Sequence, residues 1–489
     1  MKVKIQALLL LLLVAGQANA QSRAVQYEVE AWGLGSTSKR TPFWLVANQY
    51  GTAPAQAPTL GVNGQIKLDY RNDSTAKRHW NWGGGAVLNS YVGASSALII
   101  PELFVKARYK KIEIWAGRRR QTFGLMDSSL TSGSYSWSGN ALPIPKIEII
   151  IPNFVPVPFT KNLLAVKGSY AHGWFGSGAF VLHSFLHQKS LYIRLGKPSW
   201  PVKIHGGFNH QVVWGGKTSF NYLDSNLING DKFPSNLGSY LSVITGLKNL
   251  SGPQSINDFD FTNRIGNHLG TIDIGVEIEL KRHKLFVYRQ SIFEDGSLYY
   301  LINIADGLNG VSLQNLYPEP RKGKVIFKKF LFEFLYTLSQ GGPEFIIGDP
   351  SRRGLDNYFN HQQFRDGWTY QGRIIGTPFI TNQADTKRRE PYNGFELVNN
   401  NRVRVYHLGA EGFVGNHIQF LTKLSYSHNY GNYNFTYPAV PRQWSGLLQM
   451  SGDFPWLKDT KWTAATAFDY GGLYQDALAL RIGLKKTWN

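Results

Sequence analysis

The stretch TIDIGVEIEL (Thr271–Leu280) alternates without exception between apolar side chains and polar or small ones. Its even positions carry isoleucine, valine or leucine, whereas its odd positions include Asp273, Glu277 and Glu279. A helix would scatter these three carboxylates around its circumference, so the period of two predicts a β-strand with one apolar face and one polar face. About ten residues of such alternation are typical of a strand in an outer-membrane barrel.

The same period recurs along the chain. Lys329–Leu338 and His417–Ser427 alternate in the same way, and weaker candidates are Gly64–Tyr70, Glu102–Tyr109, Ile112–Gly117, Leu191–Leu195 and Val403–Phe413. The uncharged run Asn81–Pro101 is broken by Gly83–Gly85 and by several serines, so we expect two strands and a turn there and not a spanning helix. A soluble β-sandwich or propeller is the alternative, although its strands are usually shorter.

The last strand finishes the sequence. Leu478, Leu480, Ile482, Leu484 and Trp488 alternate with polar or small residues up to the end, as closure of a barrel onto a final strand requires. This pattern resembles the terminal assembly signal of outer-membrane barrels, with two departures. Lys486 stands where an apolar residue is expected, and Asn489 follows the aromatic residue. We expect Lys486 to extend to the membrane interface.

The N-terminus has the three parts of a secretory signal. Lys2 and Lys4 precede the apolar run Leu8–Ala15, and Ala18–Ala20 forms a small-residue cleavage site. We therefore expect residues 1–20 to be a cleaved signal peptide and residues 21–489 to form one barrel. The chain contains no cysteine, which excludes a lipobox and a disulfide framework. Aromatic residues make up 14% of the chain and charged residues only 17%, which suits a protein with one face in lipid.

These observations predict an all-β fold, a transmembrane antiparallel β-barrel of the outer membrane. At about 24–28 residues per strand with its connection, the mature chain would form about 16–20 strands. A barrel of that width leaves an aqueous lumen unless something fills it. Two long segments lack clean alternation, residues 215–266 and 341–395. They are expected either to fill the lumen or to form external loops.

A series of unusual local sequences, in a fixed order, carries a family resemblance. They are Pro42–Trp44, Asn48–Gly51, Trp115–Arg118, Ser132–Gly133, Asn140–Pro145, His210 with Trp214–Gly216, Phe293–Gly296, Asp306–Gly310, Asp356–His361, Gly376–Phe379, Asn400–Val403 and His407–Gly409. Together they resemble the Wzi-type capsule assembly family of outer-membrane proteins, over nearly the whole mature chain from about Tyr27.

The resemblance implies a barrel of about 18 strands that acts as a surface lectin and holds capsular polysaccharide on the outer face. It implies neither catalysis nor a cofactor or metal. The best-studied type in the family carries a helical bundle ahead of the barrel, which plugs the periplasmic end. Here Val25–Trp32 already has the pattern of a strand, so that plug is expected to be absent or rebuilt from another segment.

The formal net charge is +20 for the whole sequence, and removal of Lys2 and Lys4 with the expected signal peptide leaves about +18. This charge is unusually basic for an outer-membrane protein and would concentrate acidic polymers. Expected partners are acidic capsular polysaccharide, the phosphates of lipopolysaccharide and the lipid bilayer, with the capsule export machinery as an open further partner. Guanidinium groups pair bidentately with carboxylates, so the arginine clusters are candidate binding residues. They are Arg118, Arg119, Arg120, Arg352, Arg353, Arg388 and Arg389. The alternative is that they are solvated loop charges or lumen partners of Glu294, Asp295 or Glu333.

Sugars also need flat apolar platforms with a polar edge, which tryptophan and tyrosine supply. The candidates near expected loops are Trp80, Trp82, Tyr135, Trp137, Trp368 and Tyr370. The alternative for each of them is a place in the aromatic girdle at the membrane interface. Glu294–Asp295 and Asp306 are interpreted as lumen hydrogen-bond partners and not as a catalytic acid–base pair.

Three classes of function remain open. A polysaccharide-binding surface anchor is favoured. The second reading is a channel for an anionic or sugar solute, and the third is an enzyme that modifies outer-membrane lipid or glycan. The sequence contains no zincin motif, nucleophile elbow or phosphate loop, so catalysis lacks a recognisable site. A secreted chain in a membrane meets no nucleic acid, which excludes the reading that charge alone would suggest.

Overall fold

The computed structural model describes residues 25–70, 80–219, 226–247, 257, 259–260, 263–294, 297–346, 348–392, 394 and 396–488. The expected signal peptide, residues 1–20, lies outside the described residues. Among the described residues, no helix is long and apolar enough to cross a membrane.

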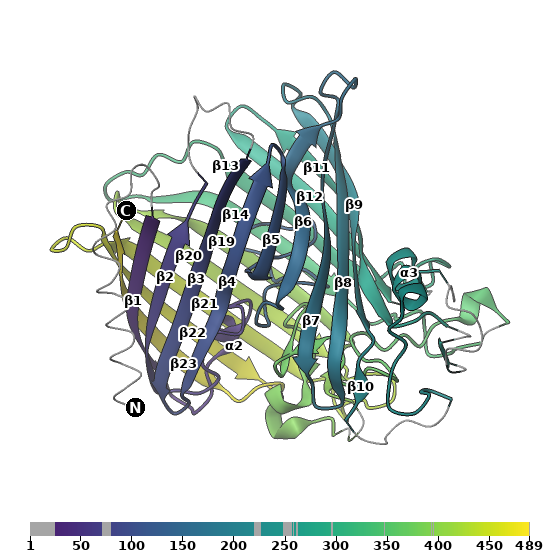
Figure 1. Cartoon of the computed structure of the whole chain (residues 1–489). Coiled ribbons are helices and arrows are strands. Elements are labelled where there is room, and N and C mark those ends of the chain that lie inside the picture. Colours follow the sequence, from purple (N-terminus) through teal and green to yellow (C-terminus); the bar gives the residue numbers. More distant parts are fainter. Residues whose placement is uncertain are drawn as a thin grey trace.

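The described chain forms one closed antiparallel barrel (Figure 1). Its long strands are β1 Val25–Ser36, β2 Thr59–Leu68, β3 Trp80–Gly93, β4 Ala97–Tyr109, β5 Ile112–Arg118, β6 Lys146–Pro156, β7 Leu164–Ser177, β8 Val181–Leu195, β9 Val202–Trp214, β11 Asn267–Glu279, β12 His283–Glu294, β13 Gly307–Asn315, β14 Val325–Tyr336, β19 Val403–Val414, β20 Ile418–Asn429, β21 Arg442–Asp453, β22 Thr460–Gly471 and β23 Ala477–Trp488. A two-residue strand, β10 Lys217–Thr218, joins β8 and brings the described sheet to 19 strands. The eighteen long strands confirm the predicted barrel and its size.

Closure joins the first strand to the last one. Strand β1 pairs with β23 from Tyr27, opposite Trp488, to Ser36, opposite Ala479. Residues Val25–Trp32 are therefore wall and not a preceding plug. The ammonium of Lys486 donates a hydrogen bond to the carbonyl of Lys458 in a turn and lies 5.9 Å from the ring centre of Trp488. Lys486 reaches the end of the barrel, as expected of a lysine at an apolar position.

The alternation predicted for TIDIGVEIEL is confirmed in β11. Ile272 and Ile274 are exposed on the outer surface, whereas Asp273 is buried inside the barrel. In β14, Phe330 and Phe332 are likewise exposed on the outer face while Glu333 is buried. Apolar side chains favour lipid and charged ones need polar partners, so the same alternation places the wall between two media.

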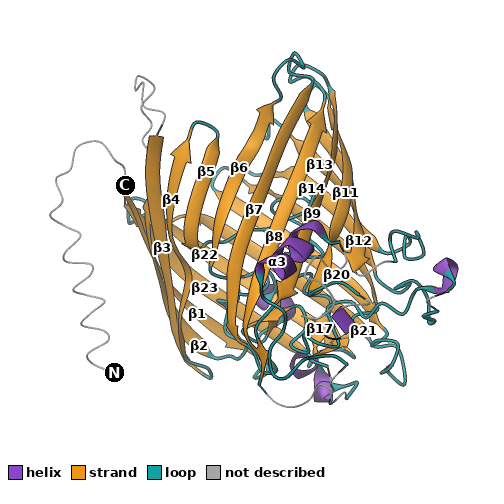
Figure 2. Cartoon of the chain, turned by 45° about the vertical axis from the view of Figure 1, so that its right-hand side comes forward, coloured by secondary structure: helices purple, strands orange, loops and turns teal. Residues whose placement is uncertain are grey.

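The two ends of the barrel differ. Both described termini lie at the end where connections are short, such as 110–111, 280–282 and 415–417, and we call it the turn end. The opposite end, the loop end, carries 37–58, 119–145, 215–266, 295–306 and 337–402. These loops contain the helices α2 Phe43–Val46, α3 Leu237–Thr245, η3 Pro350–Arg352, η4 Gln383–Asp385 and η5 Lys387–Arg389, and the short strands β15 Thr369–Tyr370, β16 Arg373–Ile374, β17 Thr381–Asn382 and β18 Val398–Asn400. Figure 2 shows α3 against the outside of the wall beside β8, and β17 among the loops at that end.

Two loops fold into the barrel from the loop end. Residues 119–145, which the sequence did not identify as a lumen-filling segment, run along the inner wall, where the backbone N–H of Leu125 donates to Asp273 at 2.8 Å. The backbone N–H of Ser132 donates to Glu333 on β14 at 2.6 Å. Residues 337–402 pack beside this loop, with Phe359 and Trp368 fully buried. In this chain, loops fill the mouth of the lumen.

Candidate functional site

A pocket of about 280 Å³ opens at the loop end, between the tip of the β7–β8 hairpin and residues 364–372. Phe175 and Phe364 supply apolar wall, and Ser177, Ser184, Thr369 and Gln371 supply polar groups. Tyr370, one of the aromatic residues predicted to contact sugar, also lines this pocket.

Asp366 fixes the wall of the pocket. Its carboxylate accepts hydrogen bonds from the backbone N–H groups of Ala179 at 2.7 Å, Phe180 at 3.1 Å and Val181 at 2.7 Å, all at the hairpin tip. The charge of this carboxylate is therefore shared among backbone donors, and the hairpin is tied to the 364–372 segment. The pocket is preformed and does not need a ligand to bring its two walls together.

Polar groups of the pocket remain available to a ligand. Within the part of the chain that the structure describes, the hydroxyls of Ser177 and Ser184 have no hydrogen-bond partner, and the side chain of Gln371 is exposed. The hydroxyl of Thr369 donates to the carbonyl of Asp366 at 2.7 Å. Small hydroxyl and amide groups beside aromatic walls can bind a compact polyhydroxylated ligand, because the hydroxyls exchange hydrogen bonds while the rings cover C–H faces.

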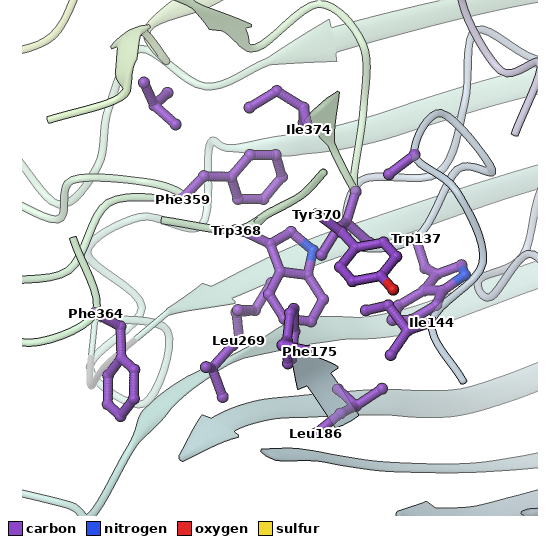
Figure 3. Close-up of a cluster of buried hydrophobic side chains, with 14 of the residues drawn as sticks. Trp137, Ile144, Phe175, Leu186, Leu269, Phe359, Phe364, Trp368, Tyr370 and Ile374 are labelled. Carbon is purple, nitrogen blue, oxygen red and sulfur yellow. The ribbon is translucent and has the colours of Figure 1, made fainter. Parts of the chain in front are cut away.

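An aromatic core supports the pocket from beneath (Figure 3). The rings of Trp137 and Trp368 meet edge to face at 5.9 Å between centres, and Phe175 lies 6.0 Å from Trp368 and 6.1 Å from Tyr370. The indole N–H of Trp368 donates to the carbonyl of Ser136 at 2.6 Å. Trp137 and Trp368, both predicted as platforms, lie in the supporting core, whereas Tyr370 reaches the pocket.

Tyr135 lies deeper in the same core and is fully buried. Its hydroxyl donates to the carboxylate of Glu294 at 2.5 Å. Burial, followed by the neighbouring charge of Glu294, raises the pKa of Tyr135 well above its ordinary value, so the phenol keeps its proton. Glu294 also accepts the backbone N–H of Phe359 at 3.0 Å. This pair joins the 119–145 and 337–402 loops to the wall.

Of the cluster Arg118–Arg120, Arg118 ends β5, and Arg119 and Arg120 begin the 119–145 loop. Arg118 donates to the hydroxyl of Tyr370 at 2.9 Å, and Arg119 pairs with Glu113 at 2.5 Å. The backbone N–H of Arg120 donates to Glu102 at 3.0 Å. The carboxylates are Glu113 and Glu102, not Glu294 or Glu333, and Asp295 lies outside the described residues. Among the described residues, Arg118 is the one of the three arginines that bonds to a residue of the pocket.

The other predicted residues lie apart from the pocket. Arg352 pairs with Glu344, and Arg353 donates to the hydroxyl of Tyr300 at 2.9 Å. Arg388 and Arg389 form an exposed basic segment with Lys387 at the loop end.

Trp80 and Trp82 are exposed by 67% and 57% at the turn end of β3, and Trp80 packs against Tyr109 with 4.8 Å between ring centres. They occupy the outer face, where girdle residues lie.

Sequence reasoning missed most of the pocket. Phe175, Ser177, Ser184 and Phe364 lie where strand alternation ends or inside a loop, and Gly178 made the hairpin tip indistinguishable from an ordinary turn. Their proximity depends on contacts between segments almost 200 residues apart, such as Asp366 with Val181. The one local signal was the aromatic pair Trp368 and Tyr370, which identified the correct loop.

Comparison with known proteins supplies three findings. The family model of capsule assembly protein Wzi matches residues 94–388. The structure of Wzi from Escherichia coli, an outer-membrane protein involved in group 1 capsule assembly and described as a carbohydrate-binding β-barrel, superposes with a TM-score of 0.57. It is 12% identical, with 94% of this chain and 83% of that chain covered, so the likeness concerns the fold alone. No curated protein sequence matches the chain.

A second solved structure matches with a lower score. OccD3 (OpdP) of Pseudomonas aeruginosa is 9% identical, covers 97% of this chain and 93% of its own, and gives a TM-score of 0.44.

Proposed function

The chain belongs to the Wzi family of capsule assembly proteins, and from this premise we propose that it binds an exported capsular polysaccharide and holds it at the cell surface. The Escherichia coli protein of similar fold is described as carbohydrate-binding. The proposal for this chain includes no catalytic step and no cofactor: the protein acts by binding.

The orientation in the membrane supports the proposal. Outer-membrane barrels place their short turns in the periplasm and their long loops outside the cell. By this rule the loop end, with the 119–145, 215–266 and 337–402 loops, faces the exterior. The pocket beside Tyr370 then opens to the side on which capsule accumulates.

The observation that carries the proposal is the pocket itself. The hydroxyls of Ser177 and Ser184, unbonded among the described residues, and the exposed Gln371 provide polar contacts, and the aromatic walls formed by Phe175 and Phe364 provide apolar ones. A sugar ring requires both kinds of contact. At about 280 Å³ it lies at the small end of ligand pockets, which suits one or two sugar rings and not a long run of chain.

Charge supplies the long-range part of recognition. The net charge, about +18 without Lys2 and Lys4, and the exposed Lys387–Arg389 segment at the loop end would attract an acidic capsular polymer. The phosphates of lipopolysaccharide are a second expected partner for the same cations, and the capsule export machinery is a third. Arg118 contributes indirectly, by orienting the hydroxyl of Tyr370.

The test is capsule retention in a strain that lacks the gene. We expect the deletion to move capsule from the cells into the medium, and the wild-type gene to restore retention. The Ser177→Trp variant, whose indole would occupy the pocket, and the Gln371→Ala variant should restore it poorly. The matched control is Ser351→Trp, at an exposed serine of the same loop end outside the pocket. Unchanged retention in the deletion strain, together with reduced uptake of a solute, would replace this function with a channel.

A further inference from the structure

The described part of the 215–266 loop covers part of the outside of the barrel wall. On the outer face of β8 and β9, His187 and Val212 are completely buried and Trp214 is 4% exposed, although such positions normally face lipid. Their register neighbour His172 on β7 lies on the same face. Helix α3 is the element that covers them, and Figure 2 shows it in front of β8, outside the barrel.

Specific contacts hold α3 against the wall. The ring of Tyr240 stacks on Trp214 with 5.3 Å between centres, and its hydroxyl lies 3.0 Å from the hydroxyl of Tyr170 on β7. Val243 packs against the same surface and is fully buried. Arg264 donates to the carbonyl of Gly246 at 2.8 Å, and Lys189 on β8 donates to that of Ile244, so two cations satisfy the C-terminal carbonyls of the helix.

The opposite face of α3 is apolar and uncovered. Leu237 and Leu241, four residues apart on one side of the helix, are 74% and 45% exposed, and Leu247 just beyond its end is 58% exposed. Three neighbouring leucines in water would be an unusual surface for a short helix that already has a buried face. Their surroundings along the wall identify what covers them.

The leucines continue an existing lipid-facing surface. On the side of α3 toward the turn end, Leu191 and Ile193 on β8 and Ile272 on β11 are exposed on the outer face. A transmembrane strand needs about 9–11 residues to cross the hydrocarbon layer. Counted up β8 from Leu195, at the turn end, the ninth residue is His187 and the eleventh is Phe185. These are the positions that α3 covers. The helix therefore lies within the hydrocarbon layer, at its edge nearer the loop end, and not outside that layer.

The level of the aromatic girdle agrees with this count. Trp174 on β7 is 41% exposed and pairs in register with Phe185 on β8. Two residues before Trp174 on the same face, His172 contacts Tyr240 of α3 with 5.8 Å between ring centres. Exposed tryptophans of a barrel wall mark the membrane–water interface. Helix α3 is therefore level with the girdle, where amphipathic helices bury one face in lipid.

We propose that α3 is a membrane-interfacial helix, which inserts Leu237, Leu241 and Leu247 among the acyl chains of the outer leaflet and shields polar groups of the barrel wall from them. The polar groups are His172, His187, His210, His268 and Lys189, all on outward-facing positions of β7, β8, β9 and β11. His210 and His268 bond to each other at 3.0 Å, and His268 lies 3.0 Å from the carbonyl of Ile265. The loop thus replaces lipid over a polar strip of wall and restores an apolar surface outside it.

The absence of cysteine makes a direct test simple, because each introduced cysteine carries the only spin label. We would label Leu241→Cys in the full-length mature barrel in lipid nanodiscs and measure collisions with oxygen, which concentrates in the bilayer, and with a water-soluble nickel chelate. Ile274→Cys on the outer face of β11 is the lipid reference, and Ala384→Cys in the exposed η4 segment is the water reference.

We expect the oxygen-to-nickel ratio at Leu241 to lie closer to that of Ile274 than to that of Ala384. A ratio closer to that of Ala384 would overturn the proposal. A label that neither reagent reaches would place a second copy of the chain on α3, and would overturn it as well. If the Leu241→Cys barrel does not fold, Leu237→Cys and Leu247→Cys are judged by the same criterion, with heat-modifiable migration as the check of folding.

Discussion

At the scale of single residues, Asp127 ties the inner loop 119–145 to the wall. Its carboxylate accepts the backbone N–H of Leu130 at 2.9 Å and the hydroxyl of Ser312 at 2.9 Å, and it pairs with Lys329 at 3.2 Å. The Asp127→Asn variant leaves the Lys329 ammonium buried without this partner. We expect the free energy of unfolding to fall by about 2–3 kcal/mol in detergent. Urea titration followed by tryptophan fluorescence measures it, with the exposed Asp453→Asn as control.

The same residue gives a pH dependence. Burial alone would raise the pKa of Asp127, but the N–H of Leu130 and the charge of Lys329 favour the carboxylate and hold the pKa below its ordinary value of 3.8. A pKa that is lower in the folded protein stabilises the fold above that value, and the contribution is lost as the pH falls below it. The stability gap between wild type and Asp127→Asn should therefore be constant from pH 8 to pH 5 and shrink below about pH 4. A gap that widens in acid would contradict this assignment.

The predicted site residues show what residue type alone can reveal. Tyr370 lines the pocket, and Arg118, the last residue of β5, donates a hydrogen bond to its hydroxyl. Trp137 and Trp368 are the same kind of residue but lie in the supporting core. Composition cannot separate a tryptophan that offers a face to solvent from one whose faces are covered by another loop. Which of these residues bind sugar stays a prediction.

At the scale of elements, the pairing of β1 with β2 depends on a close approach between an aromatic ring and a glycine. Trp32 of β1 lies across Gly61 of β2, and a Cβ atom at that glycine would stand 2.2 Å from its ring. We expect Gly61→Val to displace Trp32 and to lower the free energy of unfolding by about 1–3 kcal/mol. The matched control is Gly64→Val on the same strand, where a Cβ atom meets nothing within 4 Å. Equal folded fractions of both variants on unheated gels would refute the role given to Trp32.

Strands were predictable because the residues of each strand alternate between lipid and the barrel interior, whatever the other strands do. In β11, β14 and β23 the period of two persists for about ten residues. Strands β11 and β14 begin four residues before the predicted stretches and end one or two residues before their ends, and β23 begins one residue earlier than predicted. The inner loop 119–145 has no such local requirement. Its path depends on Asp273, Gln290 and Glu333, acceptors or donors contributed by three separate strands, so no window of sequence around it contains the information.

At the scale of the whole molecule, the loop end is closed by packed side chains. One apolar cluster joins Leu186 and Leu269 of the wall to Phe359 and Trp368 of the inward loop. We therefore expect the intact protein to give no stable porin-like conductance in planar bilayers. Deletion of residues 121–143 should produce stable openings, because it removes the segment that crosses the inner wall. Stable conductance steps from the intact protein would contradict the closed mouth and favour the channel reading.

The basic charge of the molecule predicts a rate effect. Changing Lys387–Arg389 to three glutamates at the loop end should slow association with an acidic capsular polymer by about tenfold at low ionic strength, and less as salt screens the interaction. Surface plasmon resonance on captured barrel measures this rate. Charge reversal of Lys281, Arg282 and Lys322 at the turn end is the matched control, since it changes the net charge equally on the opposite side. Equal slowing by both variants would contradict the claim that positive charge at the loop end in particular speeds association with the polymer.

The pairing of β1 with β23 also determines when the barrel can close during folding. It joins Glu30 to Arg481, partners 451 positions apart, so the ring cannot shut until the last strand is delivered. Until then β1 presents a row of unpaired backbone donors and acceptors, which lipid cannot satisfy. A stalled or shortened polypeptide keeps that open edge, and proteases and chaperones of the envelope can recognise it. The final pairing thus lets the cell distinguish a complete barrel, in which the edge of β1 is paired, from an incomplete one, in which that edge is open.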